Sequence, residues 1–235
     1  MVYALIVAAG KGSRLPGSQP KQYLPLAGVP MLVRTLRAME ACATRFERIV
    51  LVIPPEDVDF CRQRIVAPAG LKTTVALVAG GARRQDSVYR GLRDLGPDDA
   101  AVVVIHDGVR PLVPPPLIDA CVEAARQHGA GIAGVPAWDT VKRSEEGGVI
   151  ASTLPRETIW LAQTPQAFRL GLIRRAHEQA QREGFHGTDD AALVERLGTP
   201  VRLVPGSRRN IKITTREDLW IAEALAARRL GPGTG

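Results

Sequence analysis

Short, unbroken apolar runs recur along the chain, and they constrain the fold more than any other feature of the sequence. Runs of Val, Ile, Leu and Ala without polar alternation are typical of strands buried on both faces of a parallel sheet. Stretches with apolar residues at helical spacing lie between them. This alternation predicts an α/β fold, a doubly wound, mostly parallel, Rossmann-like sheet with right-handed crossovers. The predicted strands are residues 3–8, 48–53, 73–78, 101–105 and 131–135, and the helical stripes are Leu32, Leu36, Met39 and Ala43, then Ile118, Cys121, Val122 and Ala125.

Residues 139–156, DTVKRSEEGGVIASTLPR, interrupt this pattern. They predict a β-hairpin arm with strands at 140–143 and 149–153 around a Glu-Gly-Gly turn. Because an isolated hairpin is marginally stable in water, we expect the arm to pack on its own domain or on a second subunit. Apart from this arm, we interpret residues 1–235 as a single domain.

A capping pattern at its N-terminus predicts the last helix of the chain. Thr214 followed three residues later by Glu217 fits a capping box, and Leu219, Ala222 and Ala226 form an apolar stripe behind it.

Composition excludes several classes of protein. The net charge of +7 and the pI of about 9.8 raise the question of nucleic acid, but no run of five like charges occurs and aromatics make up only 4%. We therefore expect no nucleic-acid partner. No stretch approaches the ~18 apolar residues of a membrane span, and LIVAA near the start lacks the basic leader of a signal peptide. Three scattered cysteines, Cys42, Cys61 and Cys121, are typical of a reducing compartment, so we expect a cytoplasmic protein without a membrane partner.

The stretch GKGSRLPGSQPKQYL, residues 10–24, directly follows the first predicted strand. It does not fit a Walker A loop, and it lacks the third glycine of a dinucleotide fingerprint. What remains is a glycine turn whose backbone N–H groups can approach an anion, with Lys11, Arg14 and Lys21 nearby. The alternative is an ordinary connection between strand and helix with solvated cations.

Six further motifs in register extend the argument from this loop to nearly the whole chain. AAGKGSRLPGSQPKQYL resembles the opening of nucleotidyltransferases that join a nucleoside triphosphate to a phosphorylated sugar or polyol. GGARRQDSVYRGL, VIHDGVRP, DTVKR, AQTPQAF, TDDA and NIKIT resemble, in order, segments of the 2-C-methyl-D-erythritol 4-phosphate cytidylyltransferases. Small departures fall at Ala82, Gly108 and Val109. The resemblance implies a nucleotide-diphospho-sugar transferase type of fold and transfer of CMP from CTP to a polyol phosphate, with release of pyrophosphate, in non-mevalonate isoprenoid precursor synthesis.

The resemblance also implies roles for individual residues. Arg14 and Lys21 match a pair that stabilises the transition state at the triphosphate, and Lys212 and Arg156 match residues that position the acceptor phosphate. Residues that match the nucleotide site are Ala8, Ala9, Gly10, Gly12, Gly81 and Ser87. Residues that match acceptor contacts are Asp107, Arg110, Thr140 and Thr164. For Ser87 a place in the first turn of a helix is the rival interpretation, and for Arg156 it is an exposed salt bridge.

Two expectations about partners and cofactors follow from the same resemblance. The arm at 139–156 is expected to cross to a second copy, so that Thr140 and Arg156 reach the active site of the partner in a homodimer. Mg²⁺ or another divalent cation is expected to be carried mainly by the CTP phosphates, with no protein residue assigned as a metal ligand. The attacking phosphate is already charged at about −1.5 to −2, so no general base is assigned.

Other functions stay open on the sequence alone. Ribitol 5-phosphate cytidylyltransferases share most of these motifs. A non-catalytic CTP-binding regulator would use the same pocket without releasing pyrophosphate. An oxidoreductase would need an acidic ribose ligand after the second strand, where Glu56 and Asp57 lie.

Overall fold

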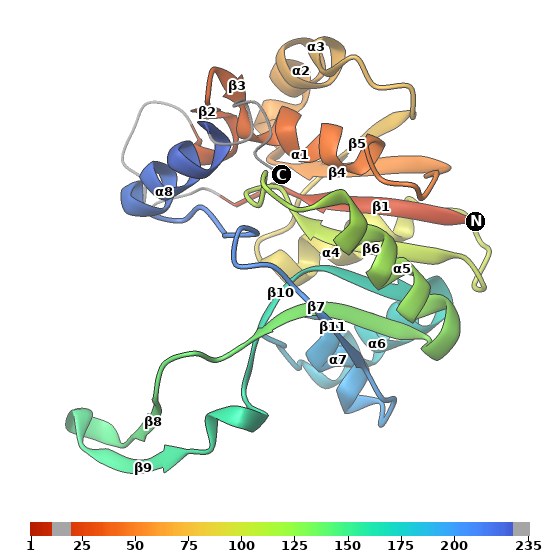
Figure 1. Cartoon of the computed structure of the whole chain (residues 1–235). Coiled ribbons are helices and arrows are strands. Elements are labelled where there is room, and N and C mark those ends of the chain that lie inside the picture. The colour runs from red at the N-terminus through yellow and green to blue at the C-terminus, as the bar shows by residue number, and fades with distance from the viewer. Residues whose placement is uncertain (11–19, 228–235) are drawn as a thin grey trace.

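A seven-stranded sheet with strand order β11-β7-β10-β6-β1-β4-β5 forms the centre of the computed structural model, which describes residues 1–10 and 20–227 (Figure 1). Neighbouring strands are parallel except where β10 pairs antiparallel with β6 and β7. The predicted fold class, a mostly parallel α/β sheet, is confirmed. The strands of the sheet are β1 (Val2–Val7), β4 (Arg48–Ile53), β5 (Val75–Ala79), β6 (Val102–Asp107), β7 (Ala130–Pro136), β10 (Trp160–Arg169) and β11 (Arg202–Pro205).

Helices cover both faces of the sheet because alternate residues of each buried strand point to opposite sides. On β1, Ala4 and Ile6 pack in the cluster that includes α1 and α5, whereas Tyr3 and Leu5 pack with α4, α6 and α7. No described helix is long and apolar enough to cross a membrane. The helices are α1 (Met31–Glu40), α2 (Val58–Cys61), α3 (Ala67–Ala69), α4 (Arg84–Arg93), α5 (Pro115–His128), α6 (Leu170–Glu183), α7 (Asp190–Arg196) and α8 (Arg216–Ala227).

The five predicted strands all exist, with ends that differ by no more than two residues from the prediction. The prediction missed β10 because Gln163, Thr164 and Gln166 place polar residues in the buried part of that strand, residues 163–168. It also extended one helical stripe too far, since α1 ends at Glu40 and Ala43 is exposed beyond it.

The predicted arm is present as two short strands, β8 (Val141–Ser144) and β9 (Ile150–Leu154), which pair antiparallel in a sheet of their own. Gly147 and Gly148 turn the chain between them with φ of 81° and 80°, a backbone conformation that favours glycine. The arm projects away from the central sheet in Figure 1. Near its tip, Val149 and Ile150 are 63% and 60% exposed, so these apolar side chains are not covered within one chain.

The last helix begins one residue later than predicted. The backbone N–H of Asp218 donates to Oγ1 of Thr215, and the Asp218 carboxylate accepts from the Thr215 N–H at 2.8 Å. The capping box is therefore formed by Thr215 and Asp218, not by Thr214 and Glu217. Behind it, α8 packs on the small hairpin of β2 (Pro25–Leu26) and β3 (Val29–Pro30).

Candidate active site

A cavity of about 520 Å³ lies where β1 and β6 reach their carboxyl ends. In open α/β sheets this edge is where ligands bind, because backbone groups and loop side chains converge there. Ala8, Ala9 and Gly10 line the cavity directly after β1, and Lys21 lies in the short helical turn Lys21–Tyr23 at its side. We call this cavity the nucleotide pocket.

Gly81 and Ser87 form one wall of the nucleotide pocket. The Gly81 N–H donates to Oγ of Ser87 at 3.0 Å, and the Ser87 hydroxyl donates to the Arg83 carbonyl at 3.0 Å. Ser87 is thus in the first turn of α4 and on the pocket wall at once, and its contact with the nucleotide stays a prediction. At the adjacent Gly80, a Cβ would lie 2.2 Å from that of Ala9, so the close approach of the two segments requires glycine.

Asp107, the last residue of β6, is surrounded by cations. Its Oδ1 accepts from Nε of Arg84 at 3.0 Å, and its Oδ2 lies 2.8 Å from Nζ of Lys212 and 3.8 Å from Nε of Arg110. Burial by itself would raise the pKa of Asp107, but the positive charges of Arg84 and Lys212 outweigh it and hold that pKa well below its usual range. The carboxylate is therefore ionised at neutral pH.

A second, smaller cavity of about 240 Å³ adjoins the nucleotide pocket, and we call it the acceptor pocket. Arg84, Asp107 and Lys212 line both cavities, so these three residues form the boundary between them. The other residues of the acceptor pocket are Arg110, Ala162, Gln163, Thr164, Gln166, Thr188 and Asp189.

Hydrogen bonds fix Thr164 and His106 behind this boundary. The Asp107 N–H donates to Oγ1 of Thr164 at 3.0 Å, and Oγ1 lies 3.1 Å from Nδ1 of His106. His106 Nε2 lies 3.2 Å from the carbonyl of Arg110, which can only accept. Neutral His106 therefore carries its proton on Nε2 and accepts from the Thr164 hydroxyl at Nδ1.

The segment that carries Lys212 is anchored by the buried Asn210. Its Nδ2 donates to the Thr164 carbonyl at 2.8 Å and to Oε1 of Gln163 at 3.2 Å. The Asn210 carbonyl accepts from Nη1 of Arg110 at 2.7 Å. These bonds connect β10 and the loop after β6 to the chain two residues before Lys212.

The structure brings most of the residues singled out in the sequence together around the two pockets. Gly12 and Arg14 lie outside the described residues. The nucleotide pocket contains Ala8, Ala9, Gly10, Lys21, Gly81 and Ser87, the shared boundary contains Asp107 and Lys212, and the acceptor pocket contains Arg110 and Thr164.

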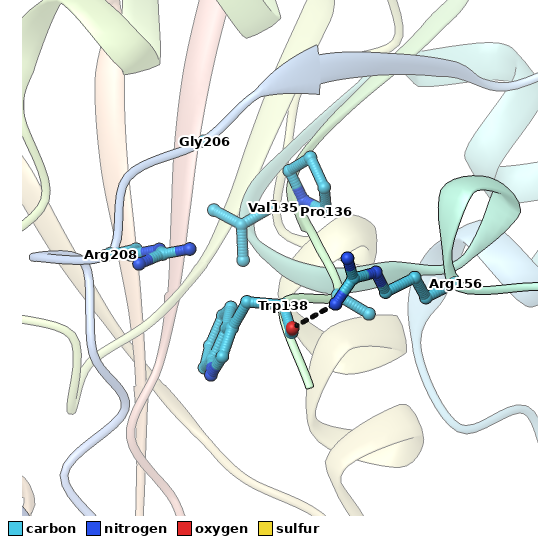
Figure 2. A pocket seen from close by; sticks show the side chains of 7 residues that line it. Val135, Pro136, Trp138, Arg156, Gly206 and Arg208 are labelled. Carbon is cyan, nitrogen blue, oxygen red and sulfur yellow. Dashed lines mark hydrogen bonds between the residues drawn. The ribbon is translucent and has the colours of Figure 1, made fainter. Parts of the chain in front are cut away.

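Thr140 and Arg156 do not lie in either pocket of this chain. Thr140 is exposed at the start of the arm. The Arg156 side chain is 54% exposed, and its Nη1 donates to the Trp138 carbonyl at 3.1 Å. Figure 2 shows Arg156 and Arg208 on different sides of Trp138, where both line a separate hollow at the base of the arm. Cζ of Arg208 lies 4.8 Å from the centre of the Trp138 ring, in a cation–π contact.

Sequence reasoning assigned no role to Arg84, Thr188 or Asp189, although each lines the acceptor pocket. All three fall inside motifs that were singled out, Arg84 in GGARRQDSVYRGL and the other two in TDDA. Their motif membership was the available signal. The motifs do not reveal that Arg84 pairs with Asp107, because these two residues are 23 positions apart in the chain and meet only in the fold.

Comparison with known proteins agrees with this arrangement. A family model described as 2-C-methyl-D-erythritol 4-phosphate cytidylyltransferase matches residues 2–228. The protein of that name from Pelotomaculum thermopropionicum is 49% identical over 230 residues, which cover 98% of this chain and 96% of the relative. The one from Geobacter metallireducens is 49% identical over 231 residues, with 97% and 99% covered.

Among solved structures, 4-diphosphocytidyl-2C-methyl-D-erythritol synthase from Anaerococcus prevotii superposes with a TM-score of 0.85 at 33% identity, covering 97% of this chain and 96% of that one. A mostly parallel sheet with two adjoining pockets at its carboxyl edge, together with these relatives, defines a nucleotidyltransferase. The chain belongs to the 2-C-methyl-D-erythritol 4-phosphate cytidylyltransferase family. The resemblance of the sequence motifs to this family is confirmed.

Proposed function

We propose that this chain transfers CMP from CTP to 2-C-methyl-D-erythritol 4-phosphate and releases pyrophosphate, a step of non-mevalonate isoprenoid precursor biosynthesis. Relatives that match nearly the whole chain are 2-C-methyl-D-erythritol 4-phosphate cytidylyltransferases by name, which supports the two substrates. The observation that carries the proposal is the boundary of Arg84, Asp107 and Lys212 shared by the two pockets. A reaction that joins two phosphate-bearing molecules needs adjoining sites with positive charge where they meet.

In the proposed mechanism CTP occupies the nucleotide pocket. The wall of Gly81 and Ser87 faces the cytosine, and the backbone after β1 approaches the nucleotide closely. Lys21 stabilises the charge that builds on the α-phosphate, and the family resemblance gives Arg14 the same role. Loss of either cation is expected to lower turnover by about a hundredfold, by analogy with a lost oxyanion donor.

The acceptor occupies the second pocket in this mechanism. The Asp107 carboxylate accepts hydrogen bonds from its hydroxyl groups, Arg110 and Thr164 contact the same molecule, and Lys212 holds its phosphate beside the α-phosphorus. The phosphate oxygen attacks without a general base because it is already ionised. His106 supports this part of the proposal, since both of its ring nitrogens are engaged in the buried network.

A divalent cation, Mg²⁺ or a related ion, enters the proposal as part of the bound CTP. Among the described residues no group of three or more His, Cys, Asp or Glu could hold a metal. Asp107 is the one carboxylate in the described lining of the nucleotide pocket, and its oxygens already face Arg84 and Lys212. These residues fit an ion held by phosphate oxygens, where it would neutralise part of their charge.

We further propose a homodimer in which the arm, residues 139–156, crosses to the second copy. Val149 and Ile150 near its tip are exposed, and a second subunit would cover them. Arg156 lines a hollow separate from the acceptor pocket of its own chain, so we expect it to bind an acceptor phosphate in the partner's pocket. Thr140, at the start of the arm, would reach the partner's acceptor pocket in the same way.

We place the enzyme in the cytoplasm. The three cysteines are unpaired, and burial raises the pKa of the Cys42 thiol to about 11 and that of Cys61 and Cys121 to about 12. Unpaired, unreactive thiols are typical of proteins in a reducing compartment.

Pyrophosphate release with Mg²⁺ and CTP tests the function directly, with 2-C-methyl-D-erythritol 4-phosphate and D-ribitol 5-phosphate as alternative acceptors. We expect turnover with the erythritol compound and little with the ribitol compound. Turnover with ribitol phosphate alone would move the protein to another pathway. CTP binding without turnover on either acceptor would show a regulator instead of an enzyme.

A further inference from the structure

Arg84, the first residue of α4, connects two carboxylates from different parts of the fold. Its Nε donates to Oδ1 of Asp107 at 3.0 Å, and its Nη1 donates to Oδ2 of Asp190 at 2.7 Å. Asp190 begins α7 and its side chain is 1% exposed. Its other oxygen lies 3.3 Å from Nε2 of His177, which is fully buried on α6. A chain of polar contacts therefore runs from His177 through Asp190, Arg84 and Asp107 to Lys212.

This chain of contacts decides how the Asp107 carboxylate is oriented. Arg84 occupies Oδ1, which leaves Oδ2 for the Lys212 ammonium group at 2.8 Å. Lys212 has a long flexible stem and a side chain that is 40% exposed, so its own packing does not fix the position of Nζ. The carboxylate fixes it, and Arg84 in turn fixes the carboxylate.

The charges around the boundary depend on Arg84 as well. Three cations, Arg84, Arg110 and Lys212, lie close to two buried carboxylates, Asp107 and Asp190, so the cluster carries one net positive charge. Burial would raise the pKa of Asp190, but the Arg84 charge and the bond from His177 hold it below its usual range. Without Arg84, two ionised carboxylates would stand against two cations beside a polyanionic substrate pair.

We propose that Arg84 and Asp190 are positioning residues that act through Asp107 to hold the Lys212 ammonium group at the boundary between the two pockets. The inference rests on the proposed function, because alignment of an acceptor phosphate has meaning only if the phosphate attacks CTP. A displacement of about 1 Å in a positioning group can cost about a hundredfold in rate. The cytosine end of the nucleotide pocket, at Gly81 and Ser87, does not depend on this chain of contacts.

Three substitutions test the proposal: Arg84→Lys, Arg84→Met and Asp190→Asn. Lysine keeps the charge but cannot bond two carboxylates in the geometry of a guanidinium group. We expect kcat to fall about tenfold in Arg84→Lys and Asp190→Asn, and about a hundredfold in Arg84→Met. KM for CTP should stay within about threefold of the wild type in the two milder variants, while kcat/KM for the acceptor falls with kcat.

Arg174→Lys is the matched control. Arg174 is also a partly buried arginine, and its Nη2 donates to the carbonyls of Leu92, Leu95 and Gly96, but it lines neither pocket. We expect a lower Tm and unchanged kinetic constants at a temperature where the variant is folded. A variant that only loses stability thus has a lower Tm with unchanged kcat, whereas a variant in which Lys212 is displaced has a lower kcat while folded.

The outcomes separate this inference from the proposed function. A wild-type protein without pyrophosphate release would overturn the function itself. With an active wild type, folded Arg84→Lys and Asp190→Asn proteins whose kcat stays within twofold would overturn the positioning role. Activity losses that disappear at a temperature where the variants are folded, the behaviour expected of Arg174→Lys, would also overturn it. So would failure of all three variants to fold, because each result marks a purely structural network.

Discussion

At the scale of single residues, His106 shows how burial decides the role of a titratable group at the site. Its ring is fully buried between the Arg110 carbonyl and the Thr164 hydroxyl. Burial lowers the pKa of His106 to about 4, and the charges of Arg110 and Arg84 act in the same direction against the opposing effect of Asp107. The imidazole is therefore neutral at pH 7 and holds two site residues in place without exchanging a proton.

This lowered pKa makes stability depend on pH. An unfolded histidine takes up a proton below about pH 6.5, whereas folded His106 does so only below about pH 4. Between these values protons favour the unfolded chain, so the free energy of unfolding should fall with pH, by up to about 3 kcal/mol from this group. Above pH 6.5 the contribution of His106 should be constant.

Urea denaturation of the wild type and of His106→Gln at several pH values between 4 and 7.5 measures this effect. We expect the variant to be less stable at pH 7 and to lose less stability on acidification, so the two curves converge toward pH 4. Parallel curves would show that His106 does not contribute to the acid sensitivity.

At the scale of elements, the start of α8 depends on the capping box of Thr215 and Asp218. The sequence pattern predicted this box one residue earlier along the chain. Asp218 accepts from the N–H groups of Thr214 and Thr215, and the Thr215 hydroxyl accepts from Asp218. Asp218→Ala should lower the free energy of unfolding by about 1 kcal/mol, the usual cost of a lost cap. Glu217→Ala is the neighbouring control and should cost clearly less. Chemical denaturation at pH 7 measures both free energies of unfolding. Equal losses would show that Asp218 contributes no more to the cap than Glu217 does.

The elements also show what the sequence could and could not specify. Strands β1 and β4 were predictable because unbroken apolar runs fit only burial on both faces of a sheet. Strand β10 was not, because its Gln163 and Gln166 are buried with their amides bonded to distant groups, Ser207 and Asp189. Polar residues in a buried strand depend on partners that no local pattern reveals.

The site divides in the same way. Asp107 was indicated by its motif, VIHDGVRP, and it lies at the end of the buried strand β6, where α/β proteins carry site residues. The pairing of Arg84 with Asp190 was not, since 106 positions separate them and the contact exists only after α4 and α7 pack on the same face of the sheet. Motifs therefore indicated which segments matter, and the fold was needed to say which side chains meet.

At the scale of the whole molecule, the arm lies apart from the two pockets of its own chain. No residue of the arm is among the described residues that line them. Arg156 hydrogen-bonds to Trp138 at the base of the arm, while Asp107 and Lys212 lie at the edge of the central sheet. The arm forms its own two-stranded sheet, and a hairpin of this size is marginal unless something covers it. A second copy that receives the arm would cover the hairpin and place Arg156 beside an acceptor phosphate.

Mixed dimers test this arrangement. A Lys21→Ala chain and an Arg156→Ala chain should each be nearly inactive alone, because every site would lack one cation whichever chain supplies Arg156. If arms are exchanged, a heterodimer of the two contains one site with both defects and one site with none. We therefore expect heterodimers purified through two different tags to recover up to about half of the wild-type turnover, measured as pyrophosphate release.

The matched control pairs Lys21→Ala with Lys212→Ala. Both lysines line the nucleotide pocket of the same chain, so every site of that heterodimer keeps one defect and no recovery is expected. Only a site built from two chains makes the two mixtures differ. If the Lys21→Ala/Arg156→Ala heterodimer is no more active than this control, Arg156 serves its own chain or none, and the arm has a different role.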